Sequence, residues 1–142
     1  MVVRAGKGTA SYGDIPDESK TTIAKLTGCT WWRRLNSLII CDATSHSIFK
    51  VKLSAKVVIT RLAGDGSSGD HEGKASDMPC LDQPGDVELC VSTSFGSFAI
   101  IVGRGNDCLK WLKLTGKKDL HHIKKLGIFP VLTSPIAICN GE

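Results

Sequence analysis

The sequence predicts an all-β fold, and two observations lead to this prediction. Fifteen of the 142 residues are glycine, and the apolar residues fall in short runs separated by Gly, Asn, Asp and Ser. Many short strands joined by tight turns produce this pattern. Residues 63–66 (AGDG) also repeat residues 5–8 (AGKG) at a distance of 58 positions (63 − 5). Self-similarity at a fixed long period is typical of repeat architectures. We therefore expect a partial β-propeller built of four-stranded antiparallel blades.

Further matches keep the same order along the chain. Leu81 corresponds to Ile23, again 58 positions apart (81 − 23). Residues 106–110 (NDCLK) correspond to residues 45–49 (SHSIF) at 61 positions (106 − 45). The changed spacing places an insertion in a loop, where added residues are tolerated.

The first repeat unit contains four candidate strands. Cys29–Trp32 follows Gly28, and Leu38–Cys41 is continuously apolar, so we expect the second strand to be covered on both faces. Ile48–Leu53 alternates, with lysine on the solvent side. Val57–Leu62 is rich in β-branched residues, which favour strands.

The second unit contains the corresponding strands at Val87–Thr93, Phe98–Val102 and Cys108–Leu114. We interpret Leu120–Leu126 as a degenerate fourth strand in preference to a short helix. Residues 132–138 (LTSPIAI) then match residues 81–87 (LDQPGDV) and predict the start of a third unit.

These units predict one incomplete domain over residues 1–142, with blade one at about 26–63, blade two at about 84–126 and the start of blade three at 132–142. A closed propeller needs about four to eight blades. Because each blade buries its faces against its neighbours, the terminal blades here would expose apolar faces. We therefore expect self-association or additional blades.

Two long segments, residues 7–22 and 65–80, are polar and rich in turn-forming residues. We interpret both as loops. Loops of this length are uncommon inside compact domains and often carry binding function.

The composition is that of an ordinary folded protein, with 42% hydrophobic and 23% charged residues. The net charge of +4 permits an anionic partner without requiring one. No apolar window approaches the ~18 residues of a membrane span, and residues 1–6 lack the apolar core of a secretory signal. We expect no membrane association and a cytoplasmic location.

The six cysteines form no CxxC pair, and most sit in or beside apolar runs, where cysteine behaves as a small hydrophobe. In a chain without a secretory signal we favour buried thiols over disulfides, and disulfides over metal ligation. The cysteines are Cys29, Cys41, Cys80, Cys90, Cys108 and Cys139.

Residues 41–51 (CDATSHSIFKV) resemble the signature of the NHL repeat, an Ala-Asp-x-x-Asn-x-x-Ile-Arg-x-Ile pattern. Residues 62–66 (LAGDG) and 81–85 (LDQPG) resemble the preceding half of the same repeat. The resemblance implies a β-propeller that binds proteins or RNA. A minority of relatives are metal-dependent amidating lyases.

The chain departs from the NHL pattern at two positions. Leu26 stands where the turn proline is expected, and Gly103 stands where Asp42 lies in the first unit. Asn106 matches the family's asparagine. These departures indicate weak constraint at the signature positions.

The sequence shows no catalytic constellation. His121 and His122 are adjacent, and neighbouring residues of a strand point to opposite faces, so they are poorly placed to share a metal ion. The acidic residues of segment 65–82 lack the alternating register of a calcium loop. The amidating lyases need several histidines and an arginine around a central channel, a set that two blades with four histidines do not supply. We therefore expect no enzyme, no cofactor and no metal.

Nucleic-acid binding is a sharper alternative, because basic residues and tryptophans can hold phosphates and stack on bases. Trp31, Trp32 and Trp111 are the candidates for stacking. The ordinary interpretation is that tryptophans fill the core between blades and lysines cover solvent-facing strands and edges. We propose as candidate binding residues the basic positions in turns and near the second unit's end: Arg33, Arg34, Arg104, Lys117 and Lys118. Arg33 and Arg34 are the best surface contacts, because inter-strand turns line a propeller's binding face.

The expected function is thus that of a non-enzymatic binding scaffold, an NHL-type propeller fragment that mediates protein–protein interaction. An RNA-binding NHL module is the alternative. The amidating lyase is the third and least favoured class.

Overall fold

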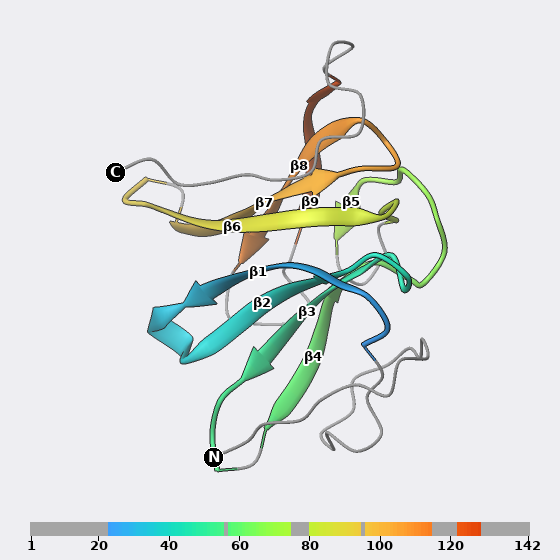
Figure 1. The fold of residues 1–142 in the computed structure, drawn as a ribbon. Helices are drawn as coiled ribbons and strands as arrows, with labels where there is room; N and C mark the ends of the chain where they lie inside the picture. Colours follow the sequence, from blue (N-terminus) through green and yellow to red (C-terminus); the bar gives the residue numbers. More distant parts are fainter. Residues whose placement is uncertain (1–22, 56, 75–79, 95, 115–121, 129–142) are drawn as a thin grey trace.

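The structure, a computed structural model, describes residues 23–55, 57–74, 80–94, 96–114 and 122–128. These residues form two antiparallel β-sheets and one short 3₁₀-helix (Figure 1). The predicted all-β class and the antiparallel pairing are confirmed. Within the described ranges the sheets do not form a closed ring. The expected third unit, residues 132–142, and the expected loop at residues 7–22 lie outside the described residues.

The first sheet is a meander in which each strand pairs with the next along the chain. Its strands are β1 (Leu26–Trp32), β2 (Ser37–Asp42), β3 (Ser47–Lys52) and β4 (Val58–Ala63). The 3₁₀-helix η1 (Arg33–Leu35) joins β1 to β2 and ends at Asn36, whose φ of 48° is left-handed. Asparagine adopts this conformation more readily than most residues do.

The second sheet repeats this meander and adds a fifth strand at its outer edge. Its strands are β6 (Pro84–Ser92), β7 (Gly96–Gly103), β8 (Cys108–Leu114), β9 (His122–Ile128) and β5 (Gly73–Lys74), with β5 paired to β9. The prediction of a fourth strand in this unit is confirmed by β9. The prediction that residues 65–80 are entirely loop is wrong, because β5 interrupts them.

The two sheets use the same turn between their second and third strands. His46 has φ 49° and Asp107 has φ 47°, and the two residues are 61 positions apart (107 − 46), the spacing of the sequence repeat. Gly64, which follows β4, has φ +90°, and a Cβ there would collide with the carbonyl oxygen of His46. Only glycine fits this position without distortion.

β1 and β6 are the strands at which the sheets meet, and they run in the same direction. Thr27 Oγ1 donates to the carbonyl oxygen of Pro84 at 2.6 Å, and further along both strands Thr30 Oγ1 donates to Glu88 Oε1 at 3.3 Å. Gly28 lies so close to β6 that a Cβ there would collide with Asp86.

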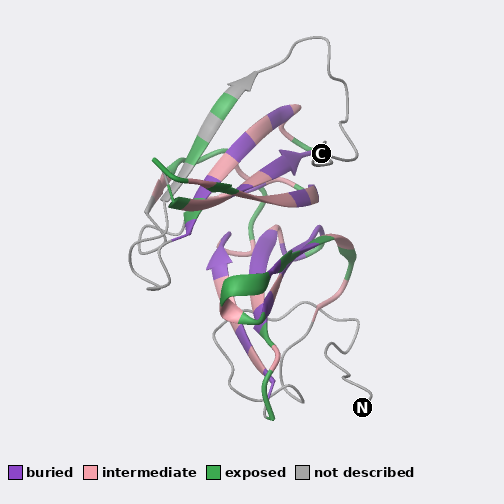
Figure 2. Cartoon of the chain, turned by 90° about the vertical axis from the view of Figure 1, so that its left-hand side faces the viewer, coloured by how far each residue is buried: buried purple, intermediate pink, exposed green. Residues whose placement is uncertain are grey.

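The main hydrophobic core lies between the sheets and draws residues from both of them. We call it the inter-sheet core: Trp32, Ile39, Cys41, Ile48, Leu62, Ala63, Leu81, Val87, Ala99, Ile101, Leu112 and Leu114. A smaller outer cluster, on the opposite face of the first sheet, consists of Ile40, Phe49, Val51, Val57 and Ile59. Figure 2 shows buried residues on both sheets where they face each other. The second strand of the first unit, Leu38–Cys41, was expected to be covered on both faces. This holds for Ile39, Ile40 and Cys41, whereas Leu38 is half-buried, as is Ile100 in β7 of the second sheet.

In the part of the chain that the structure describes, no helix has the length and apolar character needed to cross a membrane.

Candidate interaction surfaces

Asp42, at the end of β2, organises the polar end of the first sheet. Its carboxylate is fully buried and accepts hydrogen bonds from four backbone N–H groups. Two come from the segment that leads into β1, Ala24 at 2.9 Å and Lys25 at 3.0 Å. The other two come from its own turn, Thr44 at 3.0 Å and Ser45 at 3.4 Å. One side chain therefore ties the start of β1 to the turn between β2 and β3.

The second sheet performs the same task with two side chains. Gly103 stands at the position of the buried carboxylate and offers no acceptor. Asn106 Oδ1 accepts instead from the N–H of Asp82 at 3.1 Å, and His46 Nδ1, which belongs to the first sheet, accepts from the N–H of Gln83 at 3.1 Å. These two N–H groups correspond, at the spacing of 58, to those of Ala24 and Lys25. Asn106 and His46 thus accept the hydrogen bonds that correspond to two of those accepted by Asp42, and His46 belongs to the neighbouring sheet.

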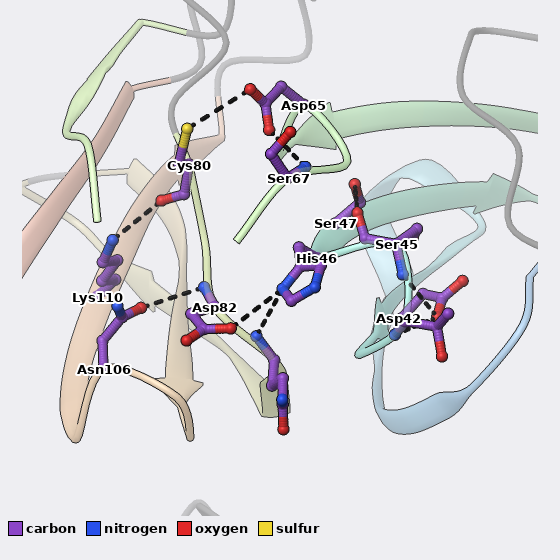
Figure 3. A network of polar contacts seen from close by, with 12 residues as sticks. Asp42, Ser45, His46, Ser47, Asp65, Ser67, Cys80, Asp82, Asn106 and Lys110 are labelled. Atoms are coloured by element: carbon purple, nitrogen blue, oxygen red, sulfur yellow. Dashed lines mark hydrogen bonds and ion pairs between the residues drawn. The ribbon is translucent and has the colours of Figure 1, made fainter. Parts of the chain in front are cut away.

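His46 consequently connects the two sheets (Figure 3). Its Nδ1 also lies 3.2 Å from Asp82 Oδ1. In the neutral ring with the proton on Nε2, Nδ1 accepts from the Gln83 amide; in the imidazolium, Nδ1–H donates to the Asp82 carboxylate. Both forms of the ring therefore bind the segment that leads into β6.

Lys110, in the middle of β8, is buried completely and points toward the first sheet. Its ammonium donates to the carbonyl oxygen of Cys80 at 3.0 Å and forms an ion pair with Asp70 Oδ1 at 2.8 Å. Figure 3 shows the contact of Lys110 with Cys80. Asp70 precedes β5 and Cys80 precedes β6, so one lysine holds both ends of the excursion that the chain makes to the sheet edge. At the spacing of 61 its counterpart is Phe49, which is also fully buried.

The same segment carries a second polar contact. Cys80 Sγ donates to Asp65 Oδ2 at 3.6 Å, and Asp65 Oδ1 accepts from the N–H of Ser67 at 2.8 Å. Burial, followed by the neighbouring Asp65, raises the pKa of the Cys80 thiol. The thiol is held in its protonated form, which suits a structural hydrogen bond and opposes nucleophilic chemistry.

The fold does not bring together the three described arginines of the predicted basic set. Arg33 and Arg34 are exposed in η1, at the end of β1. Arg104 lies in the turn between β7 and β8, where its N–H donates to the carbonyl oxygen of Gln83 beside the start of β6. Alternate turns of a meander lie at opposite ends of the strands, so the arginines of η1 and Arg104 are on opposite sides of the molecule. Lys117 and Lys118 lie outside the described residues.

The tryptophans divide between core and surface. Trp32 is 3% exposed and belongs to the inter-sheet core, as the ordinary interpretation predicts, whereas Trp31 is 42% exposed beside the two arginines of η1. One aromatic ring and two cations are therefore accessible at this end of the first sheet.

The outward face of the second sheet is apolar and only half covered. Cross-strand neighbours point to the same side of a sheet, and the pairs Phe98–Lys113, Ile100–Trp111 and Val102–Leu109 place these side chains opposite to the inter-sheet core. We call Phe98, Ile100, Leu109 and Trp111 the far face. All four are half-buried, and the rings of Phe98 and Trp111 meet edge to face at 6.0 Å.

The corresponding face of the first sheet is covered. At the spacing of 61, Ile100 corresponds to Ile39 and Leu109 corresponds to Ile48, and both of these are 0% exposed because the second sheet packs on them. The same position in the repeat is thus buried by a neighbouring sheet in one unit and partly open in the other.

Metal and disulfide chemistry find little support in the described part of the chain. No group of three or more His, Cys, Asp or Glu side chains there could hold a metal ion. Five cysteines fall within these ranges and none forms a disulfide; Cys41 and Cys108 are buried, whereas Cys29 is exposed. Cys139 lies outside the described residues.

Comparison with known proteins gives a likeness of fold. No protein-family model and no curated protein matches the chain. The structure is similar to an auxiliary nutrient binding protein from Bacteroides ovatus, with a TM-score of 0.61 and 12% identity, over 75% of this chain and 26% of that one. It is also similar to an auxiliary nutrient binding protein from Bacteroides thetaiotaomicron, with a TM-score of 0.56 and 12% identity, over 68% of this chain and 24% of that one. The chain spans about a quarter of the length of these structures.

Sequence reasoning missed two of these features. The ordinary interpretation placed lysines on solvent-facing strands and edges, whereas Lys110 is buried. A signal was present, because Lys110 and Lys113 are three positions apart in one strand and must point to opposite faces. The half-open far face was missed because an apolar run alone does not show whether a neighbour covers it.

Proposed function

We propose that this chain is a piece of an NHL-type β-propeller that acts as a non-enzymatic scaffold and binds a protein partner. The arrangement of the sheets supports the propeller interpretation, since consecutive four-stranded meanders stack with their first strands adjacent and parallel in direction. The NHL resemblance is supported at Asp42 and Asn106, because both side chains cap the backbone that leads into a first strand.

The observation that carries the protein-binding proposal is the contrast between equivalent positions of the two sheets. Ile39 and Ile48 are fully buried by a packed sheet, whereas Ile100 and Leu109 are half-buried. Contiguous apolar surface of this kind is typical of protein interaction sites. A partner that presents a complementary apolar surface would give these residues the environment that their counterparts already have.

The binding class is favoured over an enzyme by the chemistry of the described residues. The polar groups in Figure 3 are engaged in holding turns and the excursion that contains β5. The two Bacteroides structures are named as binding proteins, and at their low identity they support the fold alone.

RNA binding remains the second candidate, and one observation favours it. Trp31, Arg33 and Arg34 are consecutive or nearly so and all are exposed. An accessible indole near guanidinium groups suits stacking and phosphate contact with single-stranded RNA.

Site-specific photo-crosslinking in the cells that make the protein separates the two candidates. A photoreactive phenylalanine analogue at position 109 reports on the far face, and the same analogue at position 34 reports on η1. We expect protein adducts from position 109 that are destroyed by protease and unaffected by ribonuclease. Adducts from position 34 alone, sensitive to ribonuclease, would replace the protein-binding proposal with the RNA-binding one. No adduct at either position would contradict both.

A further inference from the structure

The linker, residues 81–83, leads into β6 and is held from both sheets. Three hydrogen bonds from the turn between β7 and β8 fix the backbone of Asp82 and Gln83, at 3.1, 3.1 and 3.3 Å. From the first sheet, His46 Nδ1 lies 3.1 Å from the backbone nitrogen of Gln83 and 3.2 Å from Asp82 Oδ1. Figure 3 shows the ring beside Asp82. One ring nitrogen thus faces a backbone donor and a carboxylate acceptor at almost equal distances.

This nitrogen can serve only one of the two groups at a time. Nδ1 carries either a lone pair or a proton. The N–H of Gln83 needs the lone pair, whereas the carboxylate of Asp82 needs the proton. The neutral ring should serve the amide, because the peptide plane fixes the direction of that N–H. The Asp82 side chain is 20% exposed, so water can solvate its carboxylate in that form.

Protonation of the ring reverses the choice. The imidazolium carries a proton on both nitrogens, so Nδ1 can no longer accept from Gln83 and instead donates to Asp82 in a charge-assisted hydrogen bond. The carboxylate stays within reach, because it packs so closely on the turn between β7 and β8 that a Cβ on Gly105 would collide with it. Histidine is the side chain that ordinarily changes its charge between about pH 5 and pH 8.

Charged side chains lie on each of the elements around the ring. In its own turn Asp42 is occupied by four backbone N–H groups. Beyond β4, Asp65 is bonded to Ser67 and to the thiol that precedes the linker. The turn between β7 and β8 carries Arg104 and Asp107, which are of opposite charge. The linker contributes Asp82, which at 3.2 Å is the carboxylate that the protonated ring meets.

We infer that His46 is a pH-sensitive clamp between the two sheets: the neutral ring holds the backbone N–H of Gln83, and the protonated ring releases it and holds the Asp82 carboxylate. The sheets stay linked in both forms, and the change falls on the entry to β6. Gln83 has a left-handed φ of 41°. A residue other than glycine is kept in this region by its surroundings, so loss of the amide bond should loosen Gln83 first. The clamp goes beyond the proposed function and does not depend on the partner.

The experiment follows amide hydrogen exchange of the isotope-labelled chain by NMR between about pH 5 and pH 8. Each rate is compared with that of an unfolded peptide at the same pH. We expect Gln83 to be protected at least about fivefold more when the ring is neutral than when it is protonated, which is the size of one hydrogen bond. The amide of Asp82 is the internal control, because Asn106 Oδ1 accepts from it at every pH. Its protection should stay constant.

His46→Asn is the matched variant. Asparagine Oδ1 is as many bonds from the backbone as histidine Nδ1, accepts a hydrogen bond and does not titrate. Asparagine also tolerates the φ of 49° at this position. We expect Gln83 to be protected equally at both ends of the pH range in this variant. In His46→Ala, which removes the acceptor, Gln83 should be unprotected throughout. Thermal melting shows whether each variant is folded, and the comparison of Gln83 with Asp82 in the original chain needs no variant.

Three results would overturn the clamp. The first is equal protection of Gln83 at both ends of the pH range in the original chain. The second is a neutral ring whose nitrogen shifts place the proton on Nδ1, because that form already donates to Asp82. The third is a pH-dependent Gln83 in His46→Asn, which would assign the change to another group. None of these results bears on the adducts from position 109, so the proposed function stands or falls separately.

Discussion

The two sheets have the same topology and the same turns, yet they hold those turns with different side chains. In the first sheet Asp42 alone binds the segment that enters β1. In the second sheet Gly103 occupies that position, and the task falls to Asn106 and to His46 of the other sheet. The comparison shows that the repeat conserves the backbone hydrogen bonds that must be satisfied, while the residue that satisfies them can change.

A second difference lies inside the sheets. Phe49 fills its position in the first sheet, and Lys110 fills the equivalent position in the second, both without exposure to solvent. The lysine is accommodated because the excursion containing β5 brings Asp70 and the carbonyl oxygen of Cys80 to its ammonium. A buried charge is tolerated when it is paired in this way. The segment between β4 and β6 therefore supplies the partners that allow a lysine to be buried at this position.

The largest expected loss of stability comes from removing the Asp42 carboxylate. It tests whether Asp42 alone does in the first sheet what Asn106 and His46 do in the second. Asp42→Ala leaves four N–H groups without their acceptor, and hydrogen bonds to a charged group contribute about 1.5–3 kcal/mol each. We expect a loss of at least about 3 kcal/mol in the free energy of unfolding. Asn106→Ala removes one acceptor and should cost only about 1 kcal/mol. Urea denaturation of the two variants gives both values, and equal losses would show that the two sheets do not differ in this way.

The ion pair between the buried Lys110 and the exposed Asp70 gives the next largest effect. Asp70→Ala leaves the Lys110 ammonium buried with one remaining partner, so we expect a loss of about 2 kcal/mol, below that of a fully buried pair because solvent already screens Asp70. Lys110→Met combined with Asp70→Ala removes both charges and makes this position of the second sheet apolar, like Phe49 in the first. The double variant should therefore recover most of the lost stability in urea denaturation. A double variant less stable than Asp70→Ala alone would show that the pair is not the reason for the lysine.

A smaller effect is the change of folding stability with pH that Cys41 causes. Cys41 corresponds to Val102 of the second sheet at the spacing of 61. Burial, followed by Asp86, Cys29 and Asp42, raises the pKa of the Cys41 thiol well above its ordinary value of 9.0. Above pH 9.0 the unfolded chain loses this proton while the folded chain keeps it. Stability therefore falls as pH rises, by up to about 1.4 kcal/mol per pH unit for this thiol.

Cys41→Val gives the first sheet the side chain that the second sheet already has and removes this contribution. Thermal melting between pH 8 and pH 10.5 should show a shallower decline for the variant than for the original chain. The thiols of Cys80 and Cys90 also have raised pKa values, so part of the decline remains. Parallel curves for the two proteins would mean that Cys41 does not carry the effect.

Much of the fold follows from patterns that are local in sequence. β2 and β4 were predictable because runs of β-branched and aliphatic residues are bounded by turn residues, and β9 was expected because the first unit already had a fourth strand. β5 was not, since Gly73–Lys74 carries no pattern and exists only because the edge of β9 is available. The candidate sites depend on which face of a sheet is covered, and this is a property of neighbouring sheets that no single strand encodes.

The pairing of β5 with β9 has a consequence for the order in which the molecule forms. Every other strand pair joins neighbours along the chain and can close as a hairpin within microseconds. β5 must wait until β6, β7 and β8 have brought β9 into place, because it pairs with a strand that follows all three in the sequence. Contacts between distant parts of a chain carry the larger loop-closure entropy and form late. The excursion fastened by Lys110 should thus be the last part of the second sheet to become ordered and the first to open in hydrogen exchange.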